Sequence, residues 1–531
     1  MDVEAGSMDC DPASSTTAGT ADGPQMNLVV GSQHHFVRMA NDAPTVAGDA
    51  WTANVTVQNL TLQPFGTKDG TTPWLEGVRV FFVDEPSNGV EIFNYDGAVA
   101  FTGSDPQKYY EYAGTALGED GILGSGETSA AKSWQFTLNG ATEFSFSVLI
   151  ATEVPDPTAY AVHLTRVSPG GDYTCGDGSD GKAYCWGIAE YGLGVDTITQ
   201  SLTPLAVSTP ESVTLSNVMG GFGRYICAEG SDGNAYCWGL NNFGMLGNGT
   251  TTNSSTPVAV SAPAGVTLSN VMPGNVHACA EGSDDKIYCW GSNWYGQLGS
   301  IPDTTFSTTP VAVSAPEGVT LSDVAVGYHH TCAEGSDGNA YCWGLNTDGQ
   351  LGNGMTTNSS TPVRVSAPEG VTLSNLAAGH PHTCAEGSDG NIYCWGNNGD
   401  GELGDGTTTH SHTPVKVSVP AGVTLSNPEA GTEHTCAEGS DGNIYCWGRN
   451  TLGALGDGTT SDNSWPVMVQ APEGVTLSDV AAGGAHTCAL GSDGNTYCWG
   501  KNEYGQLGDG TSGTIDHYST TPVVVAGTRG P

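Results

Sequence analysis

The chain has 531 residues, with 56 Asp or Glu against 14 Lys or Arg, and its formal charge at neutral pH is −42. This charge argues against nucleic acid and anionic membranes as partners, because both are bound through basic residues that displace counterions. It favours a cationic partner, divalent ions or a salty medium. No apolar run reaches the roughly 18 residues of a membrane-spanning helix.

The first 157 residues are predicted to form an arm and a β-sandwich. Residues 1–25 have the composition of a flexible arm and lack both the basic start and the apolar run of a signal peptide. Strand-like segments follow at 50–63, 77–83, 89–103, 133–140 and 144–154. They predict a sandwich over 26–157 that resembles the immunoglobulin-like modules of bacterial surface proteins. Cys10 has no evident partner, so it is either free or joined to another chain.

From 158 to 531 the chain repeats one unit with a period of 52 residues, and one step is 53. Each unit offers four short strand-like segments separated by Gly, Asn and Asp turns. Four strands at a period near 50 residues predict a propeller blade, and seven such blades can close a ring. The predicted fold is therefore an all-β, seven-bladed propeller preceded by the sandwich, with "PDPT" at 155–158 as a stiff junction.

Each unit carries two cysteines ten positions apart, and the hairpin between them explains the spacing. In the last copy a type I turn with Gly494 as the left-handed residue places Cys488 opposite Cys498. Zinc and redox sites favour closer cysteine spacings, so seven cross-strand disulfides are predicted. The predicted pairs are Cys175–Cys185, Cys227–Cys237, Cys279–Cys289, Cys332–Cys342, Cys384–Cys394, Cys436–Cys446 and Cys488–Cys498. Such pairs predict an extracellular or cell-surface location, with the periplasm as the less favoured address.

The repeat "AAG…HTCAL…G…YCWG.N.YGQLGDGT….P" resembles that of the regulator-of-chromosome-condensation family, whose members form seven-bladed propellers. The resemblance covers about 165–526. The first copy is one residue short in "WGIAEYGLGVD", and the second is one residue long in "VMGGFGRYIC".

The resemblance implies several functions, because one fold hosts many sites. The family's eukaryotic namesake is a nucleotide-exchange factor for a small GTPase and binds nucleosomes, which the acidic balance argues against here. The plant ultraviolet-B photoreceptor of the family needs clustered tryptophans flanked by arginines. Here seven of the twelve tryptophans are the "WG" residues of the blades and are read as core: Trp186, Trp238, Trp290, Trp343, Trp395, Trp447 and Trp499. Secreted bacterial relatives that grip another protein with a propeller face, including an inhibitor of beta-lactamases, are the most similar in character.

The candidate chemical sites have simpler explanations. Five copies place a histidine two positions before the first cysteine, namely His277, His330, His382, His434 and His486, and the other two have Tyr173 and Tyr225. Equivalent positions lie far apart around a ring, so structural hydrogen bonding explains them better than a metal site. The "GDGTT" loops at 404–408 and 456–460 lack alternating Asp ligands, so Asx turns explain them better than calcium. No catalytic motif occurs, and no enzyme activity, cofactor or metal is predicted.

The seven copies differ from one another mainly in two loops. The loop before the first cysteine and the loop after "WG" vary, and in an up-and-down blade both emerge on one face, called here the variable face. The "GSDGN" turn and the "SAPEGVTLS" connection are nearly constant and emerge on the opposite, uniform face. The variable face carries Phe222, Arg224, Phe243, Trp294, Tyr295, Tyr328 and Tyr504, residue types that dominate protein interfaces.

These observations predict a secreted or surface-attached, non-catalytic binding or adhesion scaffold that grips a protein partner with the variable face. Neutral drift of loops after recent duplication is the alternative explanation of their variability. The alternative function is a structural subunit of an extracellular filament, joined through the N-terminal arm, Cys10 or an edge of the sandwich.

Overall fold

In the computed structural model, internal contacts divide the chain into two units, Met1–Ala161 and Val162–Pro531. The structure describes the first unit by the backbone of its ten strands, and the second over 162–528 except 189–191, 196–199, 301–303 and 514–516. The predicted junction at 155–158 lies outside the described residues. Among the described residues, no helix has the length and hydropathy needed to cross a bilayer.

The strands of the first unit form two sheets of five strands each. One sheet has the order β1-β10-β5-β8-β7, and the other has the order β2-β4-β9-β6 with β3 paired to β4. The strands are β1 (Gly6–Cys10), β2 (Val37–Asn41), β3 (Thr45–Ala47), β4 (Ala50–Asn59), β5 (Val78–Phe82), β6 (Glu91–Ile92), β7 (Gly97–Val99), β8 (Gln107–Tyr112), β9 (Lys132–Thr137) and β10 (Phe144–Thr152). Within the segment predicted as an arm, β1 pairs antiparallel with β10. The immunoglobulin-like sandwich stays a prediction.

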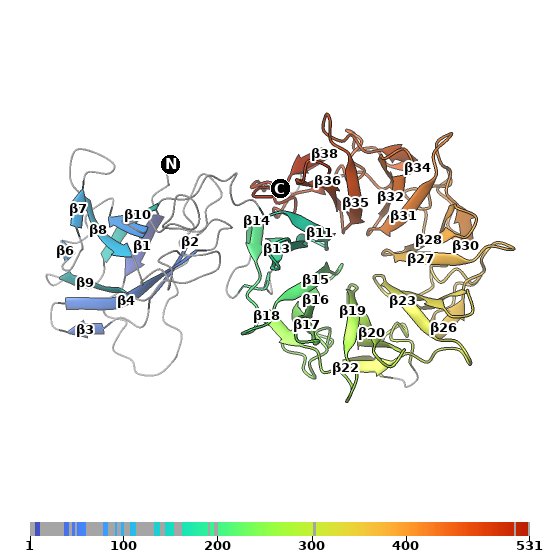
Figure 1. Ribbon diagram of the computed structural model, residues 1–531, viewed down its shortest axis with the longest axis horizontal. Helices are drawn as coiled ribbons and strands as arrows, with labels where there is room; N and C mark the ends of the chain where they lie inside the picture. Colours follow the sequence, from blue (N-terminus) through green and yellow to red (C-terminus); the bar gives the residue numbers. More distant parts are fainter. Residues whose placement is uncertain are drawn as a thin grey trace. The chain divides into compact units, whose positions relative to one another are not determined.

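The second unit confirms the predicted seven-bladed propeller: seven four-stranded antiparallel sheets surround a common centre (Figure 1). Blade 1 contains β11 (Leu164–Pro169), β12 (Tyr173–Gly178), β13 (Ala183–Ile188) and β14 (Gln200–Ala206). Blade 2 contains β15 (Leu215–Gly220), β16 (Tyr225–Gly230), β17 (Ala235–Gly239) and β18 (Ser254–Ala259). Blade 3 contains β19 (Leu268–Pro273), β20 (His277–Gly282), β21 (Ile287–Ser292) and β22 (Phe306–Ala312). Blade 4 contains β23 (Leu321–Val326), β24 (His330–Gly335), β25 (Ala340–Gly344) and β26 (Ser359–Arg364).

Blade 5 contains β27 (Leu373–Ala378), β28 (His382–Gly387), β29 (Ile392–Gly396) and β30 (Ser411–Lys416). Blade 6 contains β31 (Leu425–Ala430), β32 (His434–Gly439), β33 (Ile444–Gly448) and β34 (Asn463–Met468). Blade 7 contains β35 (Leu477–Ala482), β36 (His486–Gly491), β37 (Thr496–Lys501) and β38 (Tyr518–Val524). The first strand of each blade lies nearest the centre, and each blade takes its four strands from consecutive sequence (Figure 1).

The register of each central hairpin is the one that the turn predicts. In blade 7, Cys488 lies opposite Cys498, and Gly494 has the left-handed φ of +77°. All seven predicted cysteine pairs are disulfides, with Cα–Cα distances of 4.0 to 4.1 Å. The repeated spacing therefore encodes one covalent cross-link inside every blade.

The hydrophobic core lies between neighbouring blades. Side chains alternate along a strand, so a disulfide and the tryptophan beside it face opposite neighbours. The disulfide Cys436–Cys446 of blade 6 packs in one cluster with Ala489, Tyr497 and Trp499 of blade 7. The same arrangement recurs between the preceding blades, and all seven "WG" tryptophans are fully buried. Burial on this scale, at roughly 25 cal/mol per Å² of apolar area, is the main force that holds blades together.

Two glycines of the repeat make this packing possible. Gly500 after Trp499 has a φ of +99°, and a Cβ there would lie 2.6 Å from the carbonyl oxygen of Ala485. Gly508 of "GQLG" has a φ of +67°, and its Cβ would lie 2.5 Å from the indole nitrogen of Trp186 in the next blade. The repeat therefore needs glycine both for left-handed backbone and for close approach.

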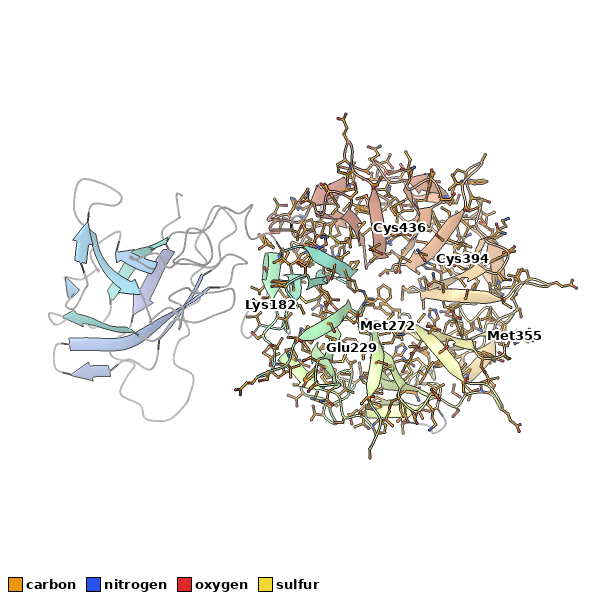
Figure 2. All side chains as sticks on the ribbon, in the orientation of Figure 1. Lys182, Glu229, Met272, Met355, Cys394 and Cys436 are labelled. Carbon is orange, nitrogen blue, oxygen red and sulfur yellow. A yellow bond between two sulfur atoms is a disulfide. The ribbon has the colours of Figure 1, made fainter. Side chains whose placement is uncertain are left out.

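The ring closes by contact between the last blade and the first. Strand β11 packs against β35 and β36, and Val162 forms a parallel bridge with Thr528. The backbone N–H of Gly484 donates to the carbonyl of Gly170 at 2.8 Å. The described side chains of this unit are drawn in Figure 2, where Met272 lies towards the centre and Met355 at the rim.

Removing one disulfide should weaken the propeller measurably. The variant Cys384→Ala/Cys394→Ala should lose about 2–3 kcal/mol of unfolding free energy, because the closed loop restricts the unfolded chain. Urea denaturation followed by tryptophan fluorescence measures the change. An unchanged midpoint would contradict a stabilising role, and the same variant under reducing conditions serves as control, because it should then match the reduced parent chain.

Candidate functional site

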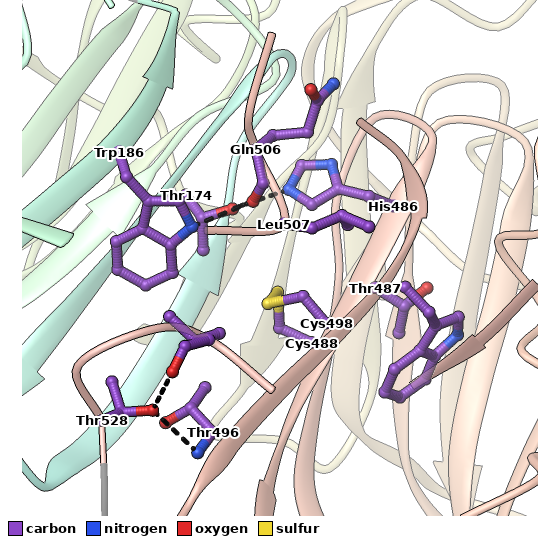
Figure 3. The surroundings of a disulfide bond; sticks show 12 residues. Thr174, Trp186, His486, Thr487, Cys488, Thr496, Cys498, Gln506, Leu507 and Thr528 are labelled. Atoms are coloured by element: carbon purple, nitrogen blue, oxygen red, sulfur yellow. Dashed lines mark hydrogen bonds between the residues drawn. A yellow bond between two sulfur atoms is a disulfide. The ribbon is translucent and has the colours of Figure 1, made fainter. Parts of the chain in front are cut away.

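The five histidines of the repeat form hydrogen bonds between neighbouring blades. In Figure 3, His486 Nε2 of blade 7 lies 2.8 Å from Thr174 Oγ1 of blade 1. Thr174 donates its hydroxyl proton to the carbonyl of Gln506 at 2.8 Å, and Trp186 Nε1 donates to the same carbonyl at 3.0 Å. The carbonyl can only accept, so the histidine Nε2–H donates to the threonine. This chain of bonds is called the inter-blade relay.

The relay repeats at every boundary where histidine occurs. The other four histidine–threonine pairs, each at 2.9 Å, are His277–Thr331, His330–Thr383, His382–Thr435 and His434–Thr487. Burial lowers the pKa of His330, His382 and His486 to about 3 and that of His434 to about 4. The side chains are therefore neutral at physiological pH, as donation from Nε2–H alone requires. Successive histidines lie in successive blades, and each has a structural role as a hydrogen-bond donor to the next blade.

The two tyrosine positions match the residues that they face. Tyr173 of blade 1 faces Ile226 of blade 2, and Tyr225 of blade 2 faces Ala278 of blade 3, so neither has a threonine to meet. The Tyr173 hydroxyl donates instead to backbone carbonyls of the next blade, those of Gly221 at 3.1 Å and Tyr225 at 2.6 Å. Wherever the following blade supplies a threonine, the preceding blade supplies a histidine.

One unsatisfied donor follows from the short loop of the first copy. Other blades offer Trp Nε1 a carbonyl from the preceding loop, such as that of Met245, which accepts from Trp290 at 2.8 Å. The first copy lacks one residue there, between Gly192 and Leu193, and the buried Nε1 of Trp238 has no hydrogen-bond partner among the described residues. The boundary between blades 1 and 2 thus lacks all three hydrogen bonds of the relay.

The "GDGT" loops are Asx turns. Asp405 Oδ1 accepts from the backbone N–H and the hydroxyl of Thr407 at 2.9 and 2.8 Å, and Asp457 and Asp509 bind Thr459 and Thr511 in the same way. In the described part of the chain, no group of three or more His, Cys, Asp or Glu side chains is arranged to hold a metal ion.

Four of the seven predicted contact residues come together on the variable face. The ring of Phe243 packs edge-on against Trp294, with centroids 4.9 Å apart. Tyr295, next in the chain, lies 5.1 Å from His329, which lies 4.8 Å from Tyr328. The Tyr328 ring lies 3.9 Å from that of His380. The six residues Phe243, Trp294, Tyr295, Tyr328, His329 and His380 extend over blades 2 to 5 and are called the aromatic strip.

Two members of the strip, His329 and His380, were not expected from the sequence. Burial lowers the pKa of His329 to about 4 and also lowers that of His380. Both rings are therefore uncharged at neutral pH and extend the apolar surface. The signal was present in "GYHHTC" and "GHPHTC", where a second histidine lies close to the relay histidine.

The other three predicted residues lie elsewhere. Phe222 lines the central channel. Arg224 is exposed in the same loop. Tyr504 lies in blade 7, with Lys501 Nζ 5.0 Å from its ring centroid. Lys501 also pairs with Asp172 at 2.8 Å, and on this face Arg449 pairs with Glu433.

The inner loops of the variable face are fixed by backbone bonds from blade to blade. The N–H of Tyr328 donates to the carbonyl of Gly379, and that of His380 donates to the carbonyl of Gly431, at 3.1 and 3.3 Å. Corresponding bonds join blades 1 and 2, 2 and 3, 6 and 7, and 7 and 1. Tyr328, His329 and His380 of the strip are thus presented by inner loops whose backbone is fixed in advance.

One buried acid interrupts the pattern of the loops after "WG". Glu402 occupies the position of Gln297, Gln350 and Gln506, and it is 1 % exposed. Its Oε2 accepts the N–H of Asp400 at 3.0 Å. The pKa of Glu402 is nevertheless raised to about 7, mainly by burial and in smaller part by the nearby charges of Asp400 and Glu433.

Comparisons with known proteins agree with this architecture. The family model described as "Regulator of chromosome condensation (RCC1) repeat" matches residues 232–280, 284–333, 337–385, 389–437, 441–490 and 493–530. The ultraviolet-B receptor UVR8 of Arabidopsis thaliana is 33 % identical over 328 residues, which are 62 % of this chain and 74 % of the receptor. The human E3 ubiquitin-protein ligase HERC2 is 29 % identical over 364 residues, which are 68 % of this chain but 7 % of the ligase.

Two solved structures share the fold. Human WBSCR16 superposes with a TM-score of 0.57 at 21 % identity and covers 65 % of this chain and 93 % of its own. Prp20p of Saccharomyces cerevisiae superposes with a TM-score of 0.56 at 20 % identity and covers 70 % of this chain and 89 % of its own.

Exchanging the two kinds of blade contact tests the inter-blade relay. Thr383→Ile should cost about 1–3 kcal/mol, because it leaves the buried His330 Nε2–H without an acceptor. Adding His330→Tyr reproduces the natural Tyr173–Ile226 contact, so the double variant should recover part of that loss. Denaturation midpoints of both single variants and the double variant give the coupling energy. Strictly additive losses would contradict the interpretation.

The buried acid should make stability depend on pH. The pKa of Glu402 in the folded state is raised to about 7 from 4.5. Its contribution to the free energy of unfolding is therefore fully present below pH 4.5 and is lost as the pH rises to 7. Glu402→Gln should therefore stabilise the propeller at pH 8 by about 1–3 kcal/mol and change little at pH 4.5. Thermal melts at both pH values measure this, and Gln350→Glu should show the converse. Equal shifts at both pH values would contradict it.

Proposed function

The chain belongs to the regulator of chromosome condensation (RCC1) repeat family, and from this premise we propose that it is a non-catalytic scaffold that binds a protein partner through its variable face. The aromatic strip is the observation that carries the proposal. Its rings come from four neighbouring blades and lie on loops that backbone bonds hold in place. A fixed surface loses little conformational entropy when it binds.

The composition of the strip suits a binding hot spot. Trp294 is 58 % exposed although its ring packs on Phe243, so a large apolar area stays open to solvent. Tryptophan and tyrosine anchors typically supply most of the energy of an interface, and polar neighbours supply the rim. The strip is uncharged at neutral pH, so binding it does not require the desolvation of an ionised group.

Charge selects the kind of partner. The chain carries −42, and on the variable face Lys501 and Arg449 are already paired with acids of the same face. A partner with apolar side chains at its centre and basic residues around them would match both the strip and its surroundings. This supports a cationic protein surface rather than an acidic one.

The relatives support protein binding in general terms. The structure of yeast Prp20p was described together with its binding properties to Gsp1p and histones, and that propeller shares the present fold. Reception of ultraviolet-B light is not proposed for this chain. Seven blade tryptophans are fully buried here, and the two exposed ones in the described propeller, Trp294 and Trp465, lie on a loop of blade 3 and on the outer strand of blade 6.

An extracellular or cell-surface location is part of the proposal. Seven disulfides, each inside a hairpin of its own blade, form and persist in an oxidising compartment. The same cross-links suit a protein that has to stay folded outside the cell.

Removing the exposed Trp294 ring and the partly buried Phe243 ring that packs against it should weaken partner binding without unfolding. Trp294→Ala/Phe243→Ala should lower the affinity for a partner at least tenfold, the loss typical of a hot-spot aromatic. The matched control is Trp465→Ala, which removes an equally exposed tryptophan (54 %) from the rim of blade 6. A partner captured from the native surroundings and identified by mass spectrometry provides the ligand for calorimetry.

Unchanged affinity in the strip variant, with the control also unchanged, would contradict the assignment to this face. Sedimentation of the purified protein tests the alternative. If the chain forms filaments and captures no foreign partner, it is a structural subunit of an assembly.

A further inference from the structure

The centre of the propeller is a channel of about 440 Å³ lined by the innermost strands of all seven blades and by Phe222. Its wall is mostly small or apolar. The residue opposite the first cysteine of each blade is, in blade order, Ser168, Met219, Met272, Ala325, Ala377, Glu429 and Ala481. All seven line the channel, and Met272 is seen towards the centre of Figure 2.

Glu429 is the one charged residue among these seven register positions. Equivalent blades fold with alanine, serine or methionine at the same register position, so the blade itself does not require a carboxylate there. Blade 6 is also the only one of the seven that places proline before this position, in "LSNPEA". The other six copies of the repeat have a neutral residue at this position, and blade 6 has an acid.

The carboxylate of Glu429 has no hydrogen-bond partner among the described residues. The charged groups that act on it are Arg166 of blade 1, which lines the same channel, and Glu438 of blade 6. Asp479 of blade 7 lines the channel as well. The Glu429 side chain is exposed to the channel. The strands around the channel raise its pKa to about 7 although Arg166 opposes this. Because the carboxylate is exposed to the channel, a ligand inside the channel can reach it.

The lining defines the chemistry of that ligand. A carboxylate selects a positive charge, and the methionine and alanine side chains of the wall suit an apolar stem. Phe222, the one aromatic side chain among the residues that line the channel, offers a ring face that attracts cations. The volume excludes a folded domain but accommodates a single long side chain or a small amine.

We propose that the channel is a binding site for an alkylammonium group, with Glu429 as its counter-ion and Phe222, Met219 and Met272 around its apolar stem. The group belongs either to a free organic amine or to a lysine side chain presented by a peptide. This site is separate from the aromatic strip and does not depend on the scaffold function proposed above.

Binding should require the ionised carboxylate. Below a pH of about 7 Glu429 takes up a proton, so the affinity for a cation should fall by up to tenfold for each further unit of pH. Arg166, Asp479 and Glu438 are the neighbouring charged groups.

Methionine methyl NMR provides the direct test, because Met219 and Met272 line the channel. The intact chain, labelled at its methionine methyl groups, is titrated at pH 8 with n-butylammonium and, separately, with an acetylated and amidated Gly-Lys-Gly peptide. Saturable shifts of the Met219 and Met272 signals are expected with at least one probe, and the probe that binds identifies the source of the group. Neutral n-butanol should bind at least tenfold more weakly.

Glu429→Gln should abolish this preference for the cation and should not unfold the chain, because the other six blades fold with a neutral residue at this register position. Glu473→Gln, which removes an exposed acid of the connection before β35, makes the same change in net charge and should leave binding intact. Phe222→Leu should weaken binding severalfold while keeping the pH dependence. The proposal is overturned if neither probe gives saturable shifts, or if Glu429→Gln binds the ammonium probes as tightly as the parent chain does.

Discussion

Contact between neighbouring blades is the constraint on which the rest of the propeller depends. A single four-stranded sheet exposes two apolar faces, and each is covered only when the disulfide side of one blade packs on the tryptophan side of the next. The inter-blade relay adds direction to this packing. A threonine and an indole donate to one loop carbonyl, and a histidine of the preceding blade donates to the threonine, so the bonds fix how far each blade is rotated against its neighbour. The relay fixes this rotation at the five boundaries with a histidine, and tyrosine hydroxyls bonded to backbone carbonyls take its place at the other two.

The exceptions in the repeat are correlated across blade boundaries, which shows that the boundary is the structural unit. Tyr173 and Tyr225 occur where the next blade has no threonine, and they bind backbone carbonyls instead. On the uniform face, Glu438 of blade 6 accepts the N–H of Asp479 of blade 7, whose backbone is left-handed. At the next boundary both positions differ: blade 7 has Leu490 in place of the glutamate, and blade 1 has Arg166, without a left-handed backbone, in place of the aspartate. Variation is tolerated when both sides of a boundary change together.

Much of this architecture is predictable from the repeat alone. The hairpin between Cys488 and Cys498 is local, and the turn at Gly494 sets its register, so the sequence suffices for the strands and the disulfide. The variable face follows from the order of the loops. By contrast, the meeting of Tyr328 with His380, or of Glu429 with Arg166, depends on blades that close a circle. Such contacts join residues 52 or more positions apart, and local patterns carry no information about them.

Every disulfide of the described propeller lies inside one blade, and none of these seven crosses from the first blade to the last. The disulfides therefore stabilise the individual blades but do not close the ring covalently. Its closure depends on β11 against β35 and β36, on the Thr174–His486 bond and on the short bridge between Val162 and Thr528. Separation of blade 7 from blade 1 would consequently open the ring while every blade stays intact, and the ring could close again without breaking any sulfur–sulfur bond.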